Sequence, residues 1–330
     1  MLTDTMAIGA MFTAMRNSVF LSDLTDRDRD VRRLLVALPV GMLAAVVAAL
    51  LGAVSACLLV MVVVSGLDGA PAAAALFLVF DQPARAATQG LASLFILAVL
   101  AGANGAAALA FVAVGAGLSH RAIRGYVTAG PVFRSRLLAA GLVLVAAIMI
   151  GLIMLAVALG VEAPQPPVLT LASTGVGRAT YAGFAIVLLI IAAAAEELVF
   201  RGWLLKHMGA FTRQPAVLMI VNGLLFAVIH FDPAPEAFLV RAAMGAGLTW
   251  MTLRTGGLEL AIGAHAANNI VVLLLLQPLS LTPPPPQPFQ VTALVSMAAV
   301  GLGYAALAEA VVRWPMVTRW IGGRRATASV

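Results

Sequence analysis

Two adjacent glutamates, Glu196 and Glu197, interrupt an otherwise apolar stretch of the sequence, and Arg201 follows one helical turn later. In a helix, Glu197 and Arg201 are four residues apart and share a face, so they can form an ion pair. Glu196 points about 100° away and is not held in the same way. A carboxylate partly removed from water binds a proton more tightly, which suits a general base. The pattern predicts a chemical role for Glu196, with a charge cluster at a helix end as the alternative.

Two further motifs place histidine in apolar segments. Phe226 precedes His230 by four residues, and His265 precedes Asn269 by four, so each pair shares one helical face. Neutral His and Asn side chains can both donate a hydrogen bond to a developing oxyanion. A packing role is the alternative for a lone histidine, and an interhelical hydrogen bond is the alternative for Asn268.

Charged side chains are rare across the whole sequence of 330 residues. Hydrophobic residues make up 62% of the chain and charged residues 10%, and the mean hydropathy is +1.04. Soluble domains are closer to half apolar and a quarter charged. The composition therefore excludes an ordinary soluble domain and predicts an all-α, polytopic membrane helix bundle within a lipid bilayer.

Eight segments are long and apolar enough to be predicted as transmembrane helices, of which the fifth and sixth are the shortest. They are 34–65, 88–117, 137–161, 180–205, 214–231, 237–254, 259–279 and 290–313. Seventeen of the 20 Lys and Arg residues then fall on one side of the membrane, and Arg85, Arg178 and Arg241 fall on the other. This asymmetry predicts that both termini are cytoplasmic.

The net charge of +6 and the pI of about 10.6 are consistent with this membrane assignment. Because the basic residues flank apolar spans, they indicate topology and contact with anionic lipid, and no nucleic-acid partner is predicted. Abundant Ala, Gly and Val with little Lys is typical of a GC-rich bacterial genome, so the predicted location is a bacterial inner membrane. We expect Arg241 to pair with Glu236 or to extend toward the membrane surface.

Taken in order, Glu-Glu-x-x-x-Arg, Phe-x-x-x-His and His-x-x-x-Asn on successive helices resemble the type II CAAX prenyl protease and bacteriocin-processing family of intramembrane proteases. That family also includes abortive-infection and bacteriocin self-immunity proteins. The resemblance covers about residues 180–280. It implies an endopeptidase that cleaves membrane-associated peptides or proteins with a glutamate-activated water. A non-catalytic immunity or partner-binding protein and, third, a transporter remain as alternatives.

The resemblance also implies a role for each motif residue. Glu196 would be the catalytic base, His230 would assist it, and His265 and Asn269 would stabilise the oxyanion. Three supporting residues would hold or line this arrangement: Glu197, Arg201 and Phe226.

The cofactor stays undecided between none and zinc. Glu196, His230 and His265 form a plausible Zn²⁺ ligand set, but the sequence has no His-Glu-x-x-His motif on a helix. The same three residues serve a metal-free mechanism equally well.

Four parts of the chain follow from these assignments. They are a cytoplasmic N-terminal segment at 1–33, the first three spans at 34–175, a protease core with spans four to seven at 176–280, and the eighth span with a cytoplasmic tail at 281–330. Within the first part, residues 5–22 are expected to form an interfacial helix or a frayed tail.

Depth in the membrane presents a conflict. Glu196 lies five residues from Arg201, or about 7–8 Å along a helix, whereas His230 lies seventeen residues from Arg213, or about 25 Å. The sequence does not show how His230 reaches the depth of Glu196. We expect the active-site cavity to lie between spans four, five and seven and to open toward the cytoplasm.

Overall fold

The computed structural model describes residues 2–68, 72–281 and 288–320, and helices dominate them, with no strand in these ranges. The prediction of an all-α helix bundle is confirmed. The long helices are α1 (Leu2–Arg16), α2 (Val31–Asp68), α5 (Gly90–Ser119), α6 (Ser135–Ala158), α8 (Gly175–Glu197), α10 (Pro215–Val228), α11 (Pro235–Thr255), α12 (Glu259–Val271) and α13 (Thr292–Arg313). Short helices are α3 (Ala72–Asp81), α4 (Pro83–Ala86), α7 (Pro167–Thr170), α9 (Leu205–Phe211) and α14 (Pro315–Trp320).

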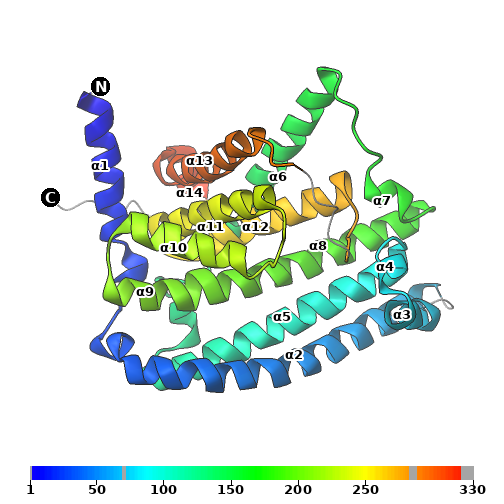
Figure 1. Cartoon of the computed structure of the whole chain (residues 1–330), viewed down its shortest axis with the longest axis horizontal. Helices are drawn as coiled ribbons and strands as arrows, with labels where there is room; N and C mark the ends of the chain where they lie inside the picture. Colours follow the sequence, from blue (N-terminus) through cyan, green and yellow to red (C-terminus); the bar gives the residue numbers. More distant parts are fainter. Residues whose placement is uncertain (1, 69–71, 282–287, 321–330) are drawn as a thin grey trace.

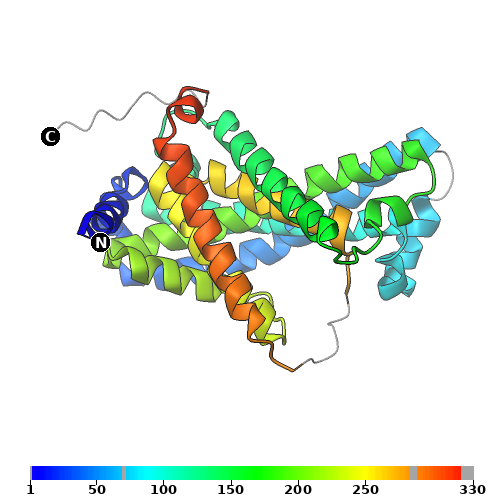
Figure 2. The ribbon, with the colours of Figure 1, turned by 90° about the horizontal axis from the view of Figure 1, so that it is seen from above.

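The helices stack in layers, as Figure 1 shows. α2 and α5 lie side by side along one face, α8 packs on α5, and α12 packs on α8 and α6. α11 lies between α10 and α13, and α13 crosses the bundle obliquely (Figure 2). Of the helices that carry the sequence motifs, α8 and α12 lie within the bundle, whereas α10 packs mainly on α11 at its edge.

Six helices within the described residues are long and apolar enough to cross a membrane. They are Val31–Val63, Gly90–Ser119, Ser135–Ala158, Gly175–Phe211, Glu259–Leu276 and Thr292–Arg313. The other two predicted spans are also helical. α10 has 14 residues and α11 has 21, but α11 is less apolar than the six. α11 is packed between α10 and α13, and α10 packs on α11 through one face while its other face is exposed.

The helix that carries Glu196 is longer than predicted, and this resolves the conflict over depth. α8 continues without a break through a π-helical segment, Leu198–Leu204, into α9. Arg201 is fully buried and does not mark a helix end. The chain turns at residues 212–214 into the antiparallel helix α10. Glu196 and His230 lie equally far from Arg213 along the sequence, so an antiparallel pair places them at the same depth.

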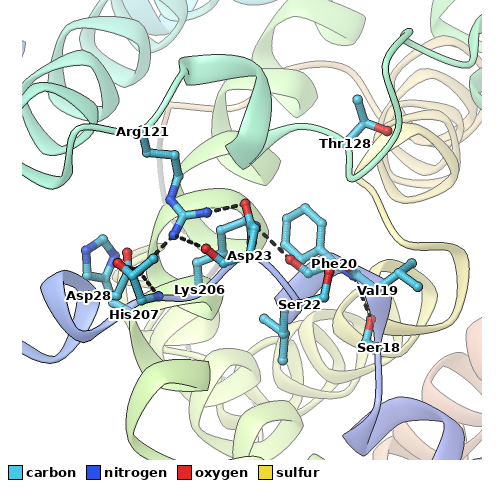
Figure 3. A network of polar contacts seen from close by, with 12 residues as sticks. Ser18, Val19, Phe20, Ser22, Asp23, Asp28, Arg121, Thr128, Lys206 and His207 are labelled. Atoms are coloured by element: carbon cyan, nitrogen blue, oxygen red, sulfur yellow. Dashed lines mark hydrogen bonds and ion pairs between the residues drawn. The ribbon is translucent and has the colours of Figure 1, made fainter.

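The N-terminal segment packs against one end of this bundle. Met15, Phe20 and Leu21 are buried, and the segment from Ser18 to Asp28 lies against α9 and the loop after α5 (Figure 3). Lys206, itself fully buried, donates to the Phe20 carbonyl at 2.6 Å and to Asp23 at 2.5 Å. The segment from Ser18 to Asp28 thus covers one side of α9.

Arg121 joins the same N-terminal segment to α5 through two carboxylates. It donates to Asp23 and, at 2.8 Å, to Asp28, which is almost fully buried (Figure 3). Burial raises the pKa of Asp28, but a backbone hydrogen bond from Thr25 and the nearby Arg121 charge outweigh it and hold this pKa below its usual value. Asp28 therefore stays ionised and keeps Arg121 paired.

Replacing Arg121 by methionine is expected to release the N-terminal segment. The change leaves the buried carboxylate of Asp28 without its cation, which is costly. Trypsin should then cleave after Arg16 and Arg27 in the folded protein faster than in the wild type, as measured by mass spectrometry of timed digests. Arg124→Met is the matched control, because Arg124 is exposed and donates only to the Pro131 carbonyl. Equal cleavage of both variants and the wild type would contradict the proposal that Arg121 holds the N-terminal segment in place.

Two glycines allow α6 and α12 to touch at the backbone. A Cβ atom on Gly263 would lie 2.0 Å from the Leu138 carbonyl oxygen, and one on Gly141 would lie 2.4 Å from that of Leu260. Small residues at such crossings let membrane helices approach closely. Since Gly263 precedes His265 by two residues, this crossing also fixes the position of the third motif.

Gly263→Ala is therefore expected to destabilise the protein by about 1–3 kcal/mol, the usual cost of overpacking. Gly151→Ala is its control, because Gly151 lies in α6 with no atom within 4 Å of the added Cβ. Alanine there should be neutral or slightly stabilising. Thermal unfolding in detergent measures both changes, and a Gly263→Ala midpoint equal to that of Gly151→Ala would contradict the contact.

Candidate active site

The carboxylate of Glu196 faces two histidines that come from two other helices. Its Oε2 atom lies 4.0 Å from Nε2 of His230, at the end of α10, and 3.8 Å from Nε2 of His265 in α12. Glu196 and His230 keep side-chain exposures of 22% and 26%, whereas His265 keeps 3%. The three residues predicted from separate motifs therefore meet at one point, and two of them remain accessible.

Hydrogen bonds fix which nitrogen of each ring carries a proton. Nδ1 of His230 lies 2.7 Å from the Phe226 carbonyl, and Nδ1 of His265 lies 2.8 Å from Oε1 of Glu197. Both partners only accept, so each Nδ1 donates. In a neutral ring Nε2 then has a lone pair, and it can donate only in the imidazolium form. With Nδ1 donating to Glu197, neutral His265 has no N–H at Nε2, which corrects the expectation that the neutral ring donates to an oxyanion.

Glu197, which points about 100° away from Glu196 around the helix, is held by the predicted partner. Arg201 donates to Oε1 of Glu197 at 2.9 Å, and both side chains are fully buried. Arg201 also donates to the Gly245 carbonyl at 3.1 Å and lies 4.4 Å from the centre of the Phe226 ring. The pairing predicted from the i,i+4 spacing is confirmed, and it links α8 with α11 and α10.

Glu197 also connects this ion pair to the histidines. Its Oε1 accepts from both Arg201 and His265, so one carboxylate orients a cation and an imidazole. Phe226 contacts both His230 and His265 edge to face, with ring centroids 4.8 and 5.6 Å apart. Phe226 therefore packs between the two histidine rings.

Two of the three motif-bearing helices, α8 and α12, continue into a π-helical segment. One runs over Leu198–Leu204 after Glu197, and the other over Val272–Leu276 after α12. A π turn rotates the following residues relative to an α-helix, and such turns are frequent at functional sites. The sequence carries no pattern that predicted either segment.

The third motif contributes an amide as well as a ring. Asn268 donates to the side-chain carbonyl of Asn269 at 3.2 Å, which leaves the amide nitrogen of Asn269 available. Both side chains line the same cavity as Glu196. The sequence indicated only an interhelical hydrogen bond for Asn268. Its position in the cavity wall was not predicted, because the four-residue spacing pairs His265 with Asn269 and not with Asn268.

A cavity of about 1000 Å³ extends from these polar residues. Besides α8, α10 and α12, its walls include α5 and α11, through Leu97, Leu100, Asn104 and Met244. No motif predicted a contribution from α5. The cavity reaches the loop at residues 231–233 and the segment at residues 277–281.

The cavity does not open toward the end of the bundle that was expected. In the predicted topology, residues 231–233 and 277–281 lie on the side with few basic residues, opposite the N-terminal segment and the other basic loops. Their presence in the cavity wall means that it opens away from the predicted cytoplasmic end. Arg201 lies within a continuous helix and not at the end of the span, so Glu196 lies deeper than predicted.

The zinc alternative can be tested against the spacing of these donors. In a tetrahedral zinc site with bonds of about 2.0–2.1 Å, neighbouring ligand atoms lie roughly 3.4 Å apart. The two Nε2 atoms lie 3.8 and 4.0 Å from Oε2 of Glu196. Across the described part of the chain, no group of three His, Cys, Asp or Glu residues is placed to hold a metal ion. The donor types suit zinc, but their arrangement does not fit it.

Comparisons with known proteins address the same region. Residues 178–271 match the family model described as type II CAAX prenyl endopeptidase Rce1-like. The uncharacterized protein YyaK of Bacillus subtilis (strain 168) is 38% identical over 98 residues, which is 28% of this chain and 33% of that protein. The match thus spans about a third of that relative's length. No solved structure matches.

The matched range contains Glu196, Glu197, Arg201, His230, His265 and Asn269, and so all three motifs. The region from residue 178 to residue 271 is therefore similar to the type II CAAX prenyl endopeptidase Rce1-like family.

Proposed function

We propose that this chain is an intramembrane protease that hydrolyses peptide bonds in membrane-associated peptides or proteins. The observation that carries the proposal is the meeting of Glu196 with two imidazole Nε2 atoms at the wall of a large cavity. Ionisable groups at membrane depth are costly and are found where function requires them. The family match of residues 178–271 to endopeptidases supports this reaction class.

Glu196 acts as the general base in this proposal. Its Oε2 atom makes no hydrogen bond within the described residues, although it is buried. It is therefore free to accept a proton from water as the water oxygen forms a bond to the scissile carbonyl carbon. His230, 4.0 Å away, orients the same water through its Nε2 lone pair.

The oxyanion of the tetrahedral intermediate needs hydrogen-bond donors. The amide nitrogen of Asn269 supplies one, because Asn268 occupies its carbonyl oxygen. His265 supplies a second when its Nε2 carries a proton, and the Glu197 carboxylate holds the ring in place by accepting from Nδ1. The buried pair of Glu197 and Arg201 thus holds a donor in place and takes no part in bond breaking.

Collapse of the intermediate breaks the carbon–nitrogen bond. The proton that Glu196 took from water passes to the leaving nitrogen, directly or through Nε2 of His230, and the products are a carboxylic acid and an amine. Each water molecule consumed therefore cleaves one peptide bond, and Glu196 returns to its starting state.

The test is cleavage of membrane-anchored reporter peptides by the purified full-length protein in liposomes. Mass spectrometry should show new termini that appear with the wild type and are lost with His230→Ala. Unchanged cleavage by His230→Ala, or none by the wild type, would contradict the proposal. A non-catalytic binding protein predicts the second result, and a transporter predicts solute flux into the same liposomes.

Metal dependence is measured in the same preparation. Glutamate-activated water predicts that activity persists after treatment with a chelator and does not follow the zinc content. Stoichiometric zinc that is lost together with activity would replace the metal-free mechanism by a metalloprotease on the same residues.

A further inference from the structure

The cavity contains one cation that the proposed reaction does not use. Arg241, in the second turn of α11, is the sole Lys or Arg among its described lining residues. It lies on the side of the cavity formed by residues 231–233, close enough to His230 for the two to interact electrostatically. A guanidinium beside the catalytic residues is a costly feature in an apolar bundle. Its position therefore calls for a partner or a ligand.

One nitrogen of the Arg241 guanidinium is hydrogen-bonded to Asp232 and not to Glu236, the partner expected from the sequence. This Nη1 atom donates to Oδ2 of Asp232 at 2.7 Å. Asp232 also accepts from the backbone N–H of Ala234 at 2.9 Å, at the start of α11. Burial raises the pKa of Asp232, but these hydrogen bonds and the Arg241 charge outweigh it, so the pKa lies below its usual value. Asp232 stays ionised and holds the guanidinium in one orientation.

The other donors of Arg241 are free. Nε and Nη2 make no hydrogen bond within the described residues, and neither is sealed from solvent. The side chain keeps 31% of its surface exposed, at the cavity. A fixed guanidinium with two free donors matches the two oxygens of a carboxylate.

The remaining cavity wall is mostly apolar, with Asn104, Gln277 and Ser280 as its polar members. Its leucine side chains are Leu97, Leu100, Leu188, Leu189, Leu273, Leu279 and Leu281. A segment that fills this space buries apolar side chains and can present one anionic group to Arg241.

We propose that Arg241 binds a carboxylate of the peptide substrate, so that the preferred substrate is an apolar segment with one carboxylate beside the scissile bond. The carboxylate is either the C-terminal group of the peptide or an Asp or Glu side chain. This inference rests on the proposed protease function. It assigns Arg241 to substrate recognition, while Glu196 and the histidines act on the peptide bond.

The experiment uses the full-length protein in liposomes and four apolar peptides of one length. One has a free C-terminal carboxylate, the second is its C-terminal amide, and the third and fourth are amides with Asp or Asn near the C-terminus. In the wild type, neutralising the recognised carboxylate should lower kcat/KM about 10- to 100-fold, as expected for a charge-assisted hydrogen bond. Comparing the free acid with its amide tests the C-terminal carboxylate, and comparing the Asp peptide with the Asn peptide tests a side-chain carboxylate.

Arg241→Met should remove this discrimination, so that kcat/KM becomes equal for the carboxylate peptides and their neutral counterparts. Arg85→Met is the matched control, because Arg85 is exposed, lies outside the cavity wall and donates to Gln82. It should discriminate between the peptides as the wild type does. An equal loss with all four peptides in Arg241→Met, or no discrimination by the wild type, would overturn the inference.

Equilibrium binding of the same peptides to the Glu196→Gln protein tests Arg241 without turnover. Carboxylate peptides should bind about 10- to 100-fold more tightly than neutral ones, and adding Arg241→Met should abolish the difference. Equal binding of all four overturns the role of Arg241. Selective binding without any cleavage by the wild type supports Arg241 and contradicts the protease function, so the two failures are distinguishable.

Discussion

Glu196→Gln is expected to lower kcat for peptide cleavage about 10²- to 10⁴-fold while the protein remains folded. Glutamine has nearly the same shape, but its amide cannot accept a proton from water, so the general-base contribution is lost. Glu196 makes no hydrogen bond within the described residues and keeps 22% of its side-chain surface exposed. Its charge therefore contributes little to the packing of the bundle. Initial rates on reporter peptides in liposomes measure the first effect, and thermal unfolding in detergent measures the second.

Glu162→Gln is the control for this substitution. Glu162 is exposed in the connection between α6 and α7 and lies outside the cavity, so the same chemical change there should leave kcat and the unfolding temperature unaltered. A Glu196→Gln protein that cleaves at the wild-type rate would remove Glu196 from the mechanism. A protein that loses activity only together with its folded state would assign Glu196 a structural role instead.

Local spacing was enough to predict the contacts that lie within one helix. The pairing of Glu197 with Arg201 follows from a separation of four residues, because helix geometry alone brings such side chains together. The same helix geometry predicted that Glu196 points away from Arg201 and takes no part in this ion pair. The all-α bundle also followed from composition, since hydrocarbon leaves few other ways to satisfy a backbone.

Contacts between helices could not be predicted from the spacing of residues within one helix. Nothing in the spacing indicates that His265 donates to Glu197, because the contact depends on how α12 crosses α8. The pairing of Arg241 with Asp232 depends on the turn between α10 and α11, in which Phe231 adopts a left-handed backbone conformation with φ of 48°. The contribution of Leu97 to the cavity depends on the packing of α5 against α8.

The error over depth has a physical cause that applies to other membrane proteins. An arginine near the end of an apolar run is usually taken as the membrane boundary. Arg201 is instead neutralised by Glu197 and satisfied further by the Gly245 carbonyl, so it can lie inside the bundle. Lys206 is likewise buried, through Asp23 and the Phe20 carbonyl. Both cations were counted as markers of the surface although the fold supplies their partners.

The largest effect on stability is expected when that buried pair is broken on one side. Arg201→Met or Glu197→Gln should each destabilise the protein by about 3–5 kcal/mol, because each leaves one buried partner uncompensated. Arg201→Met leaves the Glu197 carboxylate with His265 alone, and Glu197→Gln leaves the guanidinium with the Gly245 carbonyl and the Phe226 ring. Reversible unfolding in mixed detergent micelles gives the free energy of unfolding for each variant.

The double variant distinguishes an ion pair from two independent packing contacts. With both charges removed, no buried charge remains unpaired, so Glu197→Gln/Arg201→Met should cost clearly less than the two single changes added together. The exposed pair of Asp30 and Arg33, with side-chain exposures of 39% and 35%, is the control, and its single and double variants should change stability by less than about 1 kcal/mol. Additive losses at Glu197 and Arg201 would show that the two side chains stabilise the bundle separately. The orientation of His265 would then have to come from the packing of α12 on α6 rather than from this carboxylate.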